Sequence, residues 1–390
     1  MNWDDKISKN VQAIKPSGIR KFFDIANQIP GVLSLSIGEP DFAAPDKVCE
    51  AMKASIDARQ TSYTANSGLI ELRQEIAKLF HDRYGVDYDP VDEIMVTVGA
   101  SEGLTMALLA LTEPGDEVII PDPAYVAYPA AVKAAGGVPV FVPTYAKDDF
   151  KVTAEALEQV VTPKTKALVM GYPNNPTGTV MTREELLPIA EFVKKHDLVV
   201  MSDEIYCELV YGDTKFTSFA NLPDMRERTI VLNGFSKAYA MTGMRLGYVC
   251  APRDGLANIL KLHQYMIMCA NTQAQYGGIT ALRDCAADVE SMRQEYDVRR
   301  KVIYKGLVDM GLPVFEPKGA FYIFPDISCT GMNSEEFCEK LVKEEKVAVV
   351  PGTAFGACGE NHVRISYAAS METIKEALKR MARFVEKYRK

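Results

Sequence analysis

The stretch that decides the fold is Asn233–Tyr248, NGFSKAYAMTGMRLGY. It follows TIVL at 229–232, a short β-branched run of the kind that forms a buried strand. Its single lysine, Lys237, stands among small, aromatic and apolar residues, next to Ser236 and upstream of Arg245. The pattern therefore places one amine and a second cation in the loop that follows a strand.

A lysine in a partly desolvated place, with another cation nearby, has its charged form disfavoured and can act as an amine nucleophile towards an aldehyde. Ser236 and Arg245 are then candidate phosphate ligands, and Gly234, Gly243 and Gly247 would let the backbone approach a bound group closely. An aldehyde and a phosphate on one small molecule suggest pyridoxal 5′-phosphate (PLP). The same segment alone also fits a solvated lysine in a glycine-rich turn, so the other motifs have to decide.

Length and composition limit the possible folds and partners. A chain of 390 residues is too long for one compact core and predicts a large and a smaller domain. The net charge of −8 and the absence of a Lys/Arg run argue against nucleic acid. No apolar run is long enough to span a bilayer, and the first residues lack the form of a signal peptide. We expect small-molecule substrates and no membrane.

The cysteines and histidines carry no metal or disulfide pattern. The eight cysteines include no CxxC pair, and the four histidines are scattered along the sequence. We therefore expect no metal and no disulfides, which indicates a reducing, cytoplasmic location.

From residue 46 the pattern alternates between helix and strand. Helices are predicted near 46–58, 68–84 and 102–112, and strands at 94–98, 117–121 and 137–142. This alternation predicts an α/β fold with a mostly parallel sheet wrapped by helices. Such sheets bind ligands at the carboxyl ends of their strands, so functional residues are expected in the loops that follow strands.

Two of these loops open helices. The turn GASEG starts an apolar helix whose free N–H groups and positive dipole end form an anion site, so Ala100, Ser101 and Glu102 are candidate phosphate ligands. In PDPAYVAYP, Tyr125 or Tyr128 could stack on a flat ring, or either could fill the core.

Polar side chains follow two further strands. Asn174 and Asn175 stand in PNNPTG after KALVMGY. Asp203 and Glu204 follow LVVMS, where a buried acid is costly without a cation partner. Tyr206, three residues after Asp203, could reach the same ligand.

The two ends of the chain carry the remaining candidates. Residues 11–30 predict a turn and an amphipathic helix, and VLSLSIGEPDF then ends a strand at Gly38, whose N–H could face a carboxylate. Arg364 lies in the apolar strand HVRISY; strand arginines usually point to solvent, but this one could aim into a cleft. The rest of this part predicts long helices over 254–310, a hairpin around VFEPKGAFYIFPDI, a helix over 334–345, strands AVVPG and HVRISYA, and a helix from 371.

Taken in order, SIGEPDF, NNPTG, SDEIY, GFSKAYAMTGMRLG and VRISY resemble the PLP-dependent aminotransferases of fold type I, in the class I/II aspartate/aromatic branch. The resemblance covers essentially the whole chain. It implies a large domain over 46–285, with a mostly parallel sheet and helices on both faces. It also implies a smaller α+β domain made from 1–45 and 286–390, and a homodimer with shared active sites.

The resemblance also implies roles at the cofactor ring. Lys237 would bond the cofactor aldehyde and then carry a proton to and from the substrate Cα. Asp203 would pair with the pyridine nitrogen and keep it protonated. Asn175 and Tyr206 would hydrogen-bond the phenolic oxygen. Tyr125 would stack on the ring, where many relatives have a tryptophan.

Further roles concern the phosphate and the substrate. Residues from two loops would hold the phosphate: Ala100, Ser101, Ser236 and Arg245. Tyr63, in TSYTANSGL, matches a tyrosine that reaches the phosphate of the neighbouring subunit. Arg364 would clamp the substrate α-carboxylate bidentately, with Gly38 and Asn175 helping.

The implied reaction moves an amino group from an L-amino acid (aromatic, aspartate or broad range) to a 2-oxo acid such as 2-oxoglutarate, in two half-reactions. GASEG lacks the basic residue of some dicarboxylate-specific relatives, and the opening IKPSGIRKFFDIA resembles aromatic-preferring or broad-range members. A carbon–sulfur β-lyase of the cystathionine β-lyase type is the alternative. A PLP-sensing regulator would need a DNA-binding segment ahead of the fold, for which we expect no room.

Overall fold

The structure is a computed structural model that describes residues 1–16, 18 and 29–390 of the chain. The amphipathic helix predicted within 11–30 falls mostly on residues outside that description. Ahead of it lies one short helix, α1 (Lys9–Gln12), which packs near α6.

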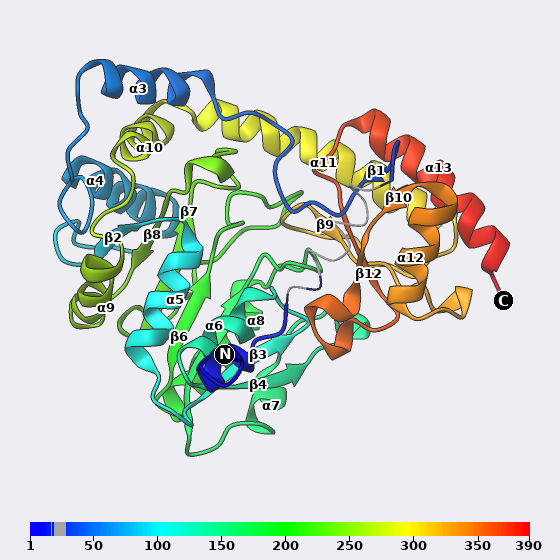
Figure 1. Cartoon of the computed structure of the whole chain (residues 1–390), viewed down its shortest axis with the longest axis horizontal. Coiled ribbons are helices and arrows are strands. Elements are labelled where there is room, and N and C mark those ends of the chain that lie inside the picture. The colour runs from blue at the N-terminus through cyan, green and yellow to red at the C-terminus, as the bar shows by residue number, and fades with distance from the viewer. Residues whose placement is uncertain (17, 19–28) are drawn as a thin grey trace.

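A seven-stranded sheet forms the centre of the molecule (Figure 1). Its strands lie in the order β2-β8-β7-β6-β5-β3-β4, and every pair is parallel except those that β8 makes with β7 and β2. The predicted mostly parallel sheet is confirmed. The strands are β2 (Ile94–Thr97), β3 (Glu117–Asp122), β4 (Val138–Pro143), β5 (Thr165–Gly171), β6 (Val199–Asp203), β7 (Thr229–Gly234) and β8 (Gly247–Cys250).

Helices cover both faces of this sheet. Because successive side chains of a strand point to opposite faces, Ile230 and Leu232 of β7 pack in a core with α5, α6 and α9, whereas Val231 packs with α3, α4 and α10. Helices α7 and α8 cover the rest of that second face. The helices are α3 (Asp46–Asp57), α4 (Ile70–Leu79), α5 (Ala100–Leu111), α6 (Ala127–Ala134), α7 (Ala154–Glu158), α8 (Arg183–Lys195), α9 (Arg253–Met266) and α10 (Thr272–Asp284).

The C-terminal part builds a second core around α11 (Ala286–Asp309), α12 (Ser334–Glu345) and α13 (Met371–Tyr388). In Figure 1, α12 (orange) and α13 (red) lie on the right, and α11 (yellow) runs across the top of the molecule towards them. They pack on a three-stranded antiparallel sheet in the order β11-β12-β9 and on a parallel pair formed by β1 and β10. The strands are β1 (Leu33–Ser34), β9 (Tyr322–Ile323), β10 (Val347–Ala348), β11 (Val350–Pro351) and β12 (Val363–Ser366).

Two predictions in this part are wrong. The hairpin expected around 314–327 does not form; within that stretch only β9 is a strand, and it pairs with β12. Pro317 and Pro325 lack the N–H groups that a ladder needs. The strand expected to end at Gly38 stops at Ser34. Leu35 still bonds the backbone of Ala348 and Ser366, but the carbonyl oxygens of Ser36 and Gly38 accept from the side chains of Arg364 and Lys237.

Candidate active site

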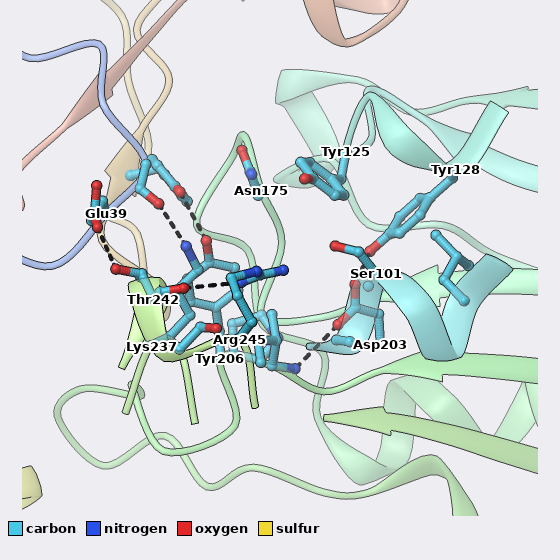
Figure 2. Close-up of a pocket in the computed structure, with 18 of the residues that line it drawn as sticks. Glu39, Ser101, Tyr125, Tyr128, Asn175, Asp203, Tyr206, Lys237, Thr242 and Arg245 are labelled. Carbon is cyan, nitrogen blue, oxygen red and sulfur yellow. Dashed lines mark hydrogen bonds between the residues drawn. The ribbon is translucent and has the colours of Figure 1, made fainter. Parts of the chain in front are cut away.

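A cavity of about 460 Å³ opens where the loops after β2, β3, β5, β6 and β7 meet, next to β9, β12 and the segment after β1 (Figure 2). This is the carboxyl edge of the parallel strands, where ligands of such sheets bind. Eleven of the predicted site residues line it: Gly38, Ala100, Ser101, Tyr125, Asn175, Asp203, Tyr206, Ser236, Lys237, Arg245 and Arg364.

Lys237 presents its amine to the cavity from the turn after β7. The side chain is half-buried, and Nζ donates a hydrogen bond of 2.6 Å to the carbonyl oxygen of Gly38. Burial, and then the charge of Arg364, lowers the pKa of Lys237 from 10.5 to about 8. Near physiological pH a much larger share of this amine is therefore neutral than in an exposed lysine, although the protonated form still predominates.

Asp203 ends β6 and is held by two hydrogen bonds. The hydroxyl of Tyr128 donates to Oδ2 at 2.8 Å, and the backbone N–H of Ile205 donates to Oδ1 at 3.2 Å. Burial raises the pKa of the Asp203 carboxyl, whereas these two donors act against that rise. Gly171 makes room for the contact, because a Cβ there would lie 2.2 Å from the Tyr128 hydroxyl.

The start of α5 and the Lys237 loop together form an anion-binding end of the cavity. Ala100 and Ser101 lie in the first turn of α5, opposite Ser236 and Arg245. Gly99, at φ +75°, leaves room for the Arg245 guanidinium, which a Cβ at Gly99 would meet at 2.7 Å. Hydroxyls, free N–H groups and a guanidinium are a donor set that fits a phosphate monoester.

The glycines of the Lys237 loop have a different use from the predicted one. A Cβ at Gly247 would lie 2.6 Å from the backbone nitrogen of Ala100, and one at Gly234 would lie 2.8 Å from the Cα of Gly247. These two glycines thus let β7, β8 and α5 approach each other, not a ligand. Of Gly234, Gly243 and Gly247, only Gly243 lines the cavity.

Arg364 is buried at the opposite end, where its guanidinium has no acidic partner. Its exposure is 2%; Nη1 donates to Asn175 Oδ1 at 3.0 Å and Nη2 to the Ser36 carbonyl oxygen at 2.6 Å. Its Cζ lies 4.5 Å from the ring centroid of Tyr322. Within the described residues no carboxylate pairs with it, and its buried Nε makes no hydrogen bond. Such a cation is costly unless a ligand supplies the anion.

The middle of the cavity is aromatic. The hydroxyls of Tyr206 and Tyr322 lie 2.8 Å apart, and Tyr125 meets Tyr128 edge-on with ring centroids 5.7 Å apart. Burial raises the pKa of both Tyr206 and Tyr322, so both phenols stay protonated at neutral pH.

Sequence reasoning missed several lining residues. Tyr322 lies in the stretch predicted as a hairpin. The sequence offers Tyr128 for stacking or as core filler, but not as a partner of Asp203. Tyr125 lies just before α6 and Tyr128 in its first turn, so their common position after the end of β3 is the signal that could place both at the cavity. The other lining residues are Glu39, Leu104, Gly171, Pro173, Ile205, Thr242 and Gly243. In Figure 2, Thr242 bonds Glu39 at one edge of the cavity.

Two predicted residues do not reach the cavity. Glu102 turns away from it: Oε1 lies 2.5 Å from Nδ1 of His263, and Oε2 accepts from the backbone N–H of Val98 at 2.5 Å. Its side chain is therefore not a ligand at this cavity. Tyr63 is 80% exposed and lies outside it. The role predicted for Tyr63 concerns a partner subunit and stays a prediction. Asn174 likewise serves the turn, since Oδ1 accepts from the Thr177 N–H and hydroxyl.

Comparisons with known proteins agree with this geometry. Residues 30–381 match the family described as aminotransferase class I and II. The chain therefore belongs to the class I and II aminotransferases, whose members use PLP, and it catalyses amino-group transfer.

The relatives resemble the chain over nearly its whole length. A putative aminotransferase, YugH, of Bacillus subtilis (strain 168) is 52% identical over 381 residues, 98% of each chain. An aspartate aminotransferase of Pyrococcus abyssi (strain GE5 / Orsay) is 49% identical, over 96% of this chain and 97% of the relative. The solved aromatic aminotransferase of Pyrococcus horikoshii OT3 has a TM-score of 0.90 at 48% identity, over 94% of this chain and 99% of the solved one. In the described part of the chain no helix has the length and apolar character of a membrane span.

Proposed function

We propose that PLP lies in this cavity with its phosphate at the first turn of α5 and its ring beside Asp203. When bound, the cofactor supplies an electron-withdrawing ring that weakens the Cα–H bond of an attached amino acid. The donor set around Ser101, Ser236 and Arg245 supports the phosphate end. The carboxylate of Asp203, steadied by Tyr128, supports the placement of the pyridine nitrogen.

Lys237 and Arg364 then act on different groups of the substrate. The neutral amine of Lys237 would hold the cofactor through its aldehyde carbon, with loss of water, until the substrate amine takes its place there. Lys237 would then be the free amine that takes the substrate Cα proton and returns it on the cofactor side. Arg364 binds the substrate α-carboxylate and so fixes which Cα–H bond faces Lys237. Asn175 and Tyr206 donate to the phenolic oxygen, and Tyr125 packs on the ring. Gly38 helps to hold the carboxylate.

One observation carries this proposal. A buried guanidinium without an acidic partner and an amine whose pKa is lowered to about 8 line the same cavity. An amino acid supplies both missing partners, a carboxylate for Arg364 and an amino group that reacts beside Lys237.

The donor side chain meets a mostly aromatic wall. Within the described residues the only cations that line the cavity are Lys237, Arg245 and Arg364, each with a role above. A side-chain carboxylate therefore has no separate basic partner there. We propose aromatic and other uncharged L-amino acids as the better donors, ahead of aspartate, and 2-oxoglutarate as an acceptor.

We also propose a homodimer in which Tyr63 reaches the partner's phosphate. Tyr63 is exposed, and so are Tyr265 (87%) and Met266 (58%) at the end of α9. A hydrogen bond of 2.8 Å from Asn66 Nδ2 to the Met268 carbonyl oxygen joins the two segments, and we propose that they form one exposed patch. Exposed patches of this kind mark interaction surfaces.

The dimer has its own test. Mixing a Tyr63→Ala protein with a Lys237→Ala protein should create some sites in which both residues are intact, and activity should exceed that of either parent. If mixed dimers form and activity does not rise, the sites are not shared through Tyr63.

Two coarser proposals concern organisation. We propose a large domain over 46–285 and a small one from 1–45 and 286–390; the pairing of β1 with β10 supports it. We propose a cytoplasmic location, supported by eight free cysteine thiols.

The decisive experiment is a half-reaction panel on the purified PLP-loaded protein. Phenylalanine, tyrosine, alanine and aspartate are added singly, and the cofactor spectrum is followed to its amino form. We expect conversion with the aromatic donors first. Borohydride reduction and peptide mapping should place the pyridoxyl group on Lys237. Release of pyruvate and ammonia from cystathionine without any oxo acid, with no conversion by the panel, would instead identify the β-lyase.

A further inference from the structure

Glu102 and His263 form a buried pair behind the first turn of α5. The His263 side chain has no exposed surface, and that of Glu102 is 6% exposed. Helices α5 and α9 pack together (Figure 1), so the contact joins α5, whose first turn lines the cavity, to the helix packed behind it.

The neighbours of this pair fix its hydrogen atoms. Nε2 of His263 lies 2.9 Å from the carbonyl oxygen of Asn66, and a carbonyl only accepts, so Nε2 carries a hydrogen. Oε2 of Glu102 accepts from the Val98 N–H. The 2.5 Å contact between Nδ1 and Oε1 then requires one more proton, held by the imidazole or by the carboxyl. Either way, the two side chains together carry no net charge.

That neutrality matters because of where Glu102 stands. Ala100 and Ser101, in the same helical turn, line the cavity at its anion-binding end. An unpaired carboxylate in this turn would repel a phosphate dianion, because the two charges would be close together and only partly screened by water. The free N–H groups of the turn favour the same anion.

We propose that His263 is a positioning residue for the cofactor phosphate. His263 neutralises Glu102 and so holds the first turn of α5 in place. The inference rests on the proposed placement of the phosphate at this turn. The same ring also holds the Asn66 carbonyl, and Asn66 belongs to the segment that carries Tyr63. His263 thus ties the phosphate helix to the exposed patch proposed for the dimer.

The test compares PLP with pyridoxal, which lacks the phosphate. Dissociation constants of both are measured by absorbance on cofactor-free protein, and their ratio reports the phosphate end alone. His263→Asn keeps a donor near Glu102 but cannot carry the proton. We expect it to weaken PLP roughly tenfold or more relative to pyridoxal, because one short-range charge is left uncompensated.

Two partner variants separate charge from shape. In Glu102→Gln the amide nitrogen can donate to a neutral His263 and the amide oxygen can accept from Val98, so the ratio should stay near that of the parent protein. The double variant, Glu102→Gln with His263→Asn, leaves no charge and should restore the ratio. A matched control is His196→Asn. His196 Nε2 lies 3.1 Å from Glu158 Oε1, and neither residue lines the cavity, so this variant should leave the ratio of the two dissociation constants unchanged.

The outcomes are distinct. An unchanged ratio in His263→Asn, or an equal loss in Glu102→Gln, overturns the inference. If His263→Asn does not fold, the double variant decides: a parental ratio supports charge compensation, and a weakened one overturns it. If Ser236→Ala and Arg245→Ala also leave the ratio unchanged, the proposed placement of the phosphate fails instead.

Discussion

The two ends of the cavity are built in different ways. At the cofactor end, Ser101, Asp203 and Lys237 follow β2, β6 and β7, which belong to one sheet, so neighbouring strands fix their positions. At the substrate end, Arg364 and Tyr322 come from the C-terminal part, and Arg364 meets the loop after β5 through a side-chain bond to Asn175. Backbone bonds between the two parts lie beside this contact, where Gly319 and Ala320 bond the carbonyl oxygens of Gly178 and Leu209.

This difference has a consequence for function. The backbone ladder of a sheet resists local change, whereas side-chain bonds between separate segments can be exchanged at small cost. We therefore expect changes at the substrate end to alter amino acid binding and leave cofactor binding intact. Changes at the cofactor end should affect every substrate through the chemical step.

The largest effect is expected for Lys237→Ala. The variant removes both the nucleophile and the proton carrier, so turnover should fall by about 10⁴-fold or more. The rate at which phenylalanine converts the cofactor spectrum in a single turnover measures this. Lys194→Ala, which loses only surface pairs with Glu191 and Asp224, is the control. Conversion at a near-parental rate would remove Lys237 from the chemistry.

Arg364→Ala tests the other end. Loss of a buried carboxylate partner costs about 2–5 kcal/mol, or roughly 30- to several-thousand-fold in kcat/KM. Phenylalanine, alanine and aspartate should all lose a similar factor, while the dissociation constant of PLP stays the same. Arg364→Lys should recover only part of the loss, because it lacks the fork that matches a carboxylate. A penalty confined to aspartate would make Arg364 a side-chain receptor.

The lowered pKa of Lys237 predicts a pH dependence of stability in the cofactor-free protein. The pKa is about 8 in the fold and 10.5 in a free chain, so between these values the unfolded chain binds more protons. The free energy of unfolding should therefore rise with pH across this window, by at most about 3 kcal/mol. Urea titrations on either side of the window measure the rise. Lys237→Met should lack this part of it; an identical rise in both proteins would mean that other groups cause it.

Sequence alone identifies the cofactor end better than the substrate end. Asp203 and Lys237 follow strands whose apolar runs are visible in the sequence, and the rule that ligands meet the carboxyl edge then brings them together. Tyr322 could not be placed, because its neighbours in VFEPKGAFYIFPDI fit a hairpin and its real partner, β12, lies far along the chain.

Glu102 shows a second limit of sequence reasoning. Its position in the first turn of an anion-binding helix predicts a ligand, but its side chain faces His263, a residue distant in sequence. The helix start is a local signal, whereas the direction of a side chain depends on what packs behind it. The same holds for Asn174 and Asn175, of which only Asn175 faces the cavity.

The smallest effect is expected for Tyr128→Phe, which sharpens the comparison within the cofactor end. The Tyr128 hydroxyl donates to the Asp203 carboxylate at 2.8 Å, and a donor to the charged form lowers the pKa of an acid. Without it, the pKa of Asp203 should rise further, so the carboxylate is lost at a higher pH. Since a hydrogen bond to a charged group contributes about 1.5–3 kcal/mol, kcat should fall by roughly 10- to 150-fold. The acid limb of the profile of kcat against pH should move upward, and activity should recover at higher pH. Asp203→Ala should lose much more of its kcat, with no recovery at any pH.

The control is Tyr172→Phe, which removes a comparable buried phenol. The Tyr172 hydroxyl donates to the Phe150 carbonyl oxygen outside the cavity, so this variant should leave the pH profile unchanged. A Tyr128→Phe profile with an unmoved acid limb would show that Tyr128 only fills space, and that the strand end alone holds Asp203 in its working state.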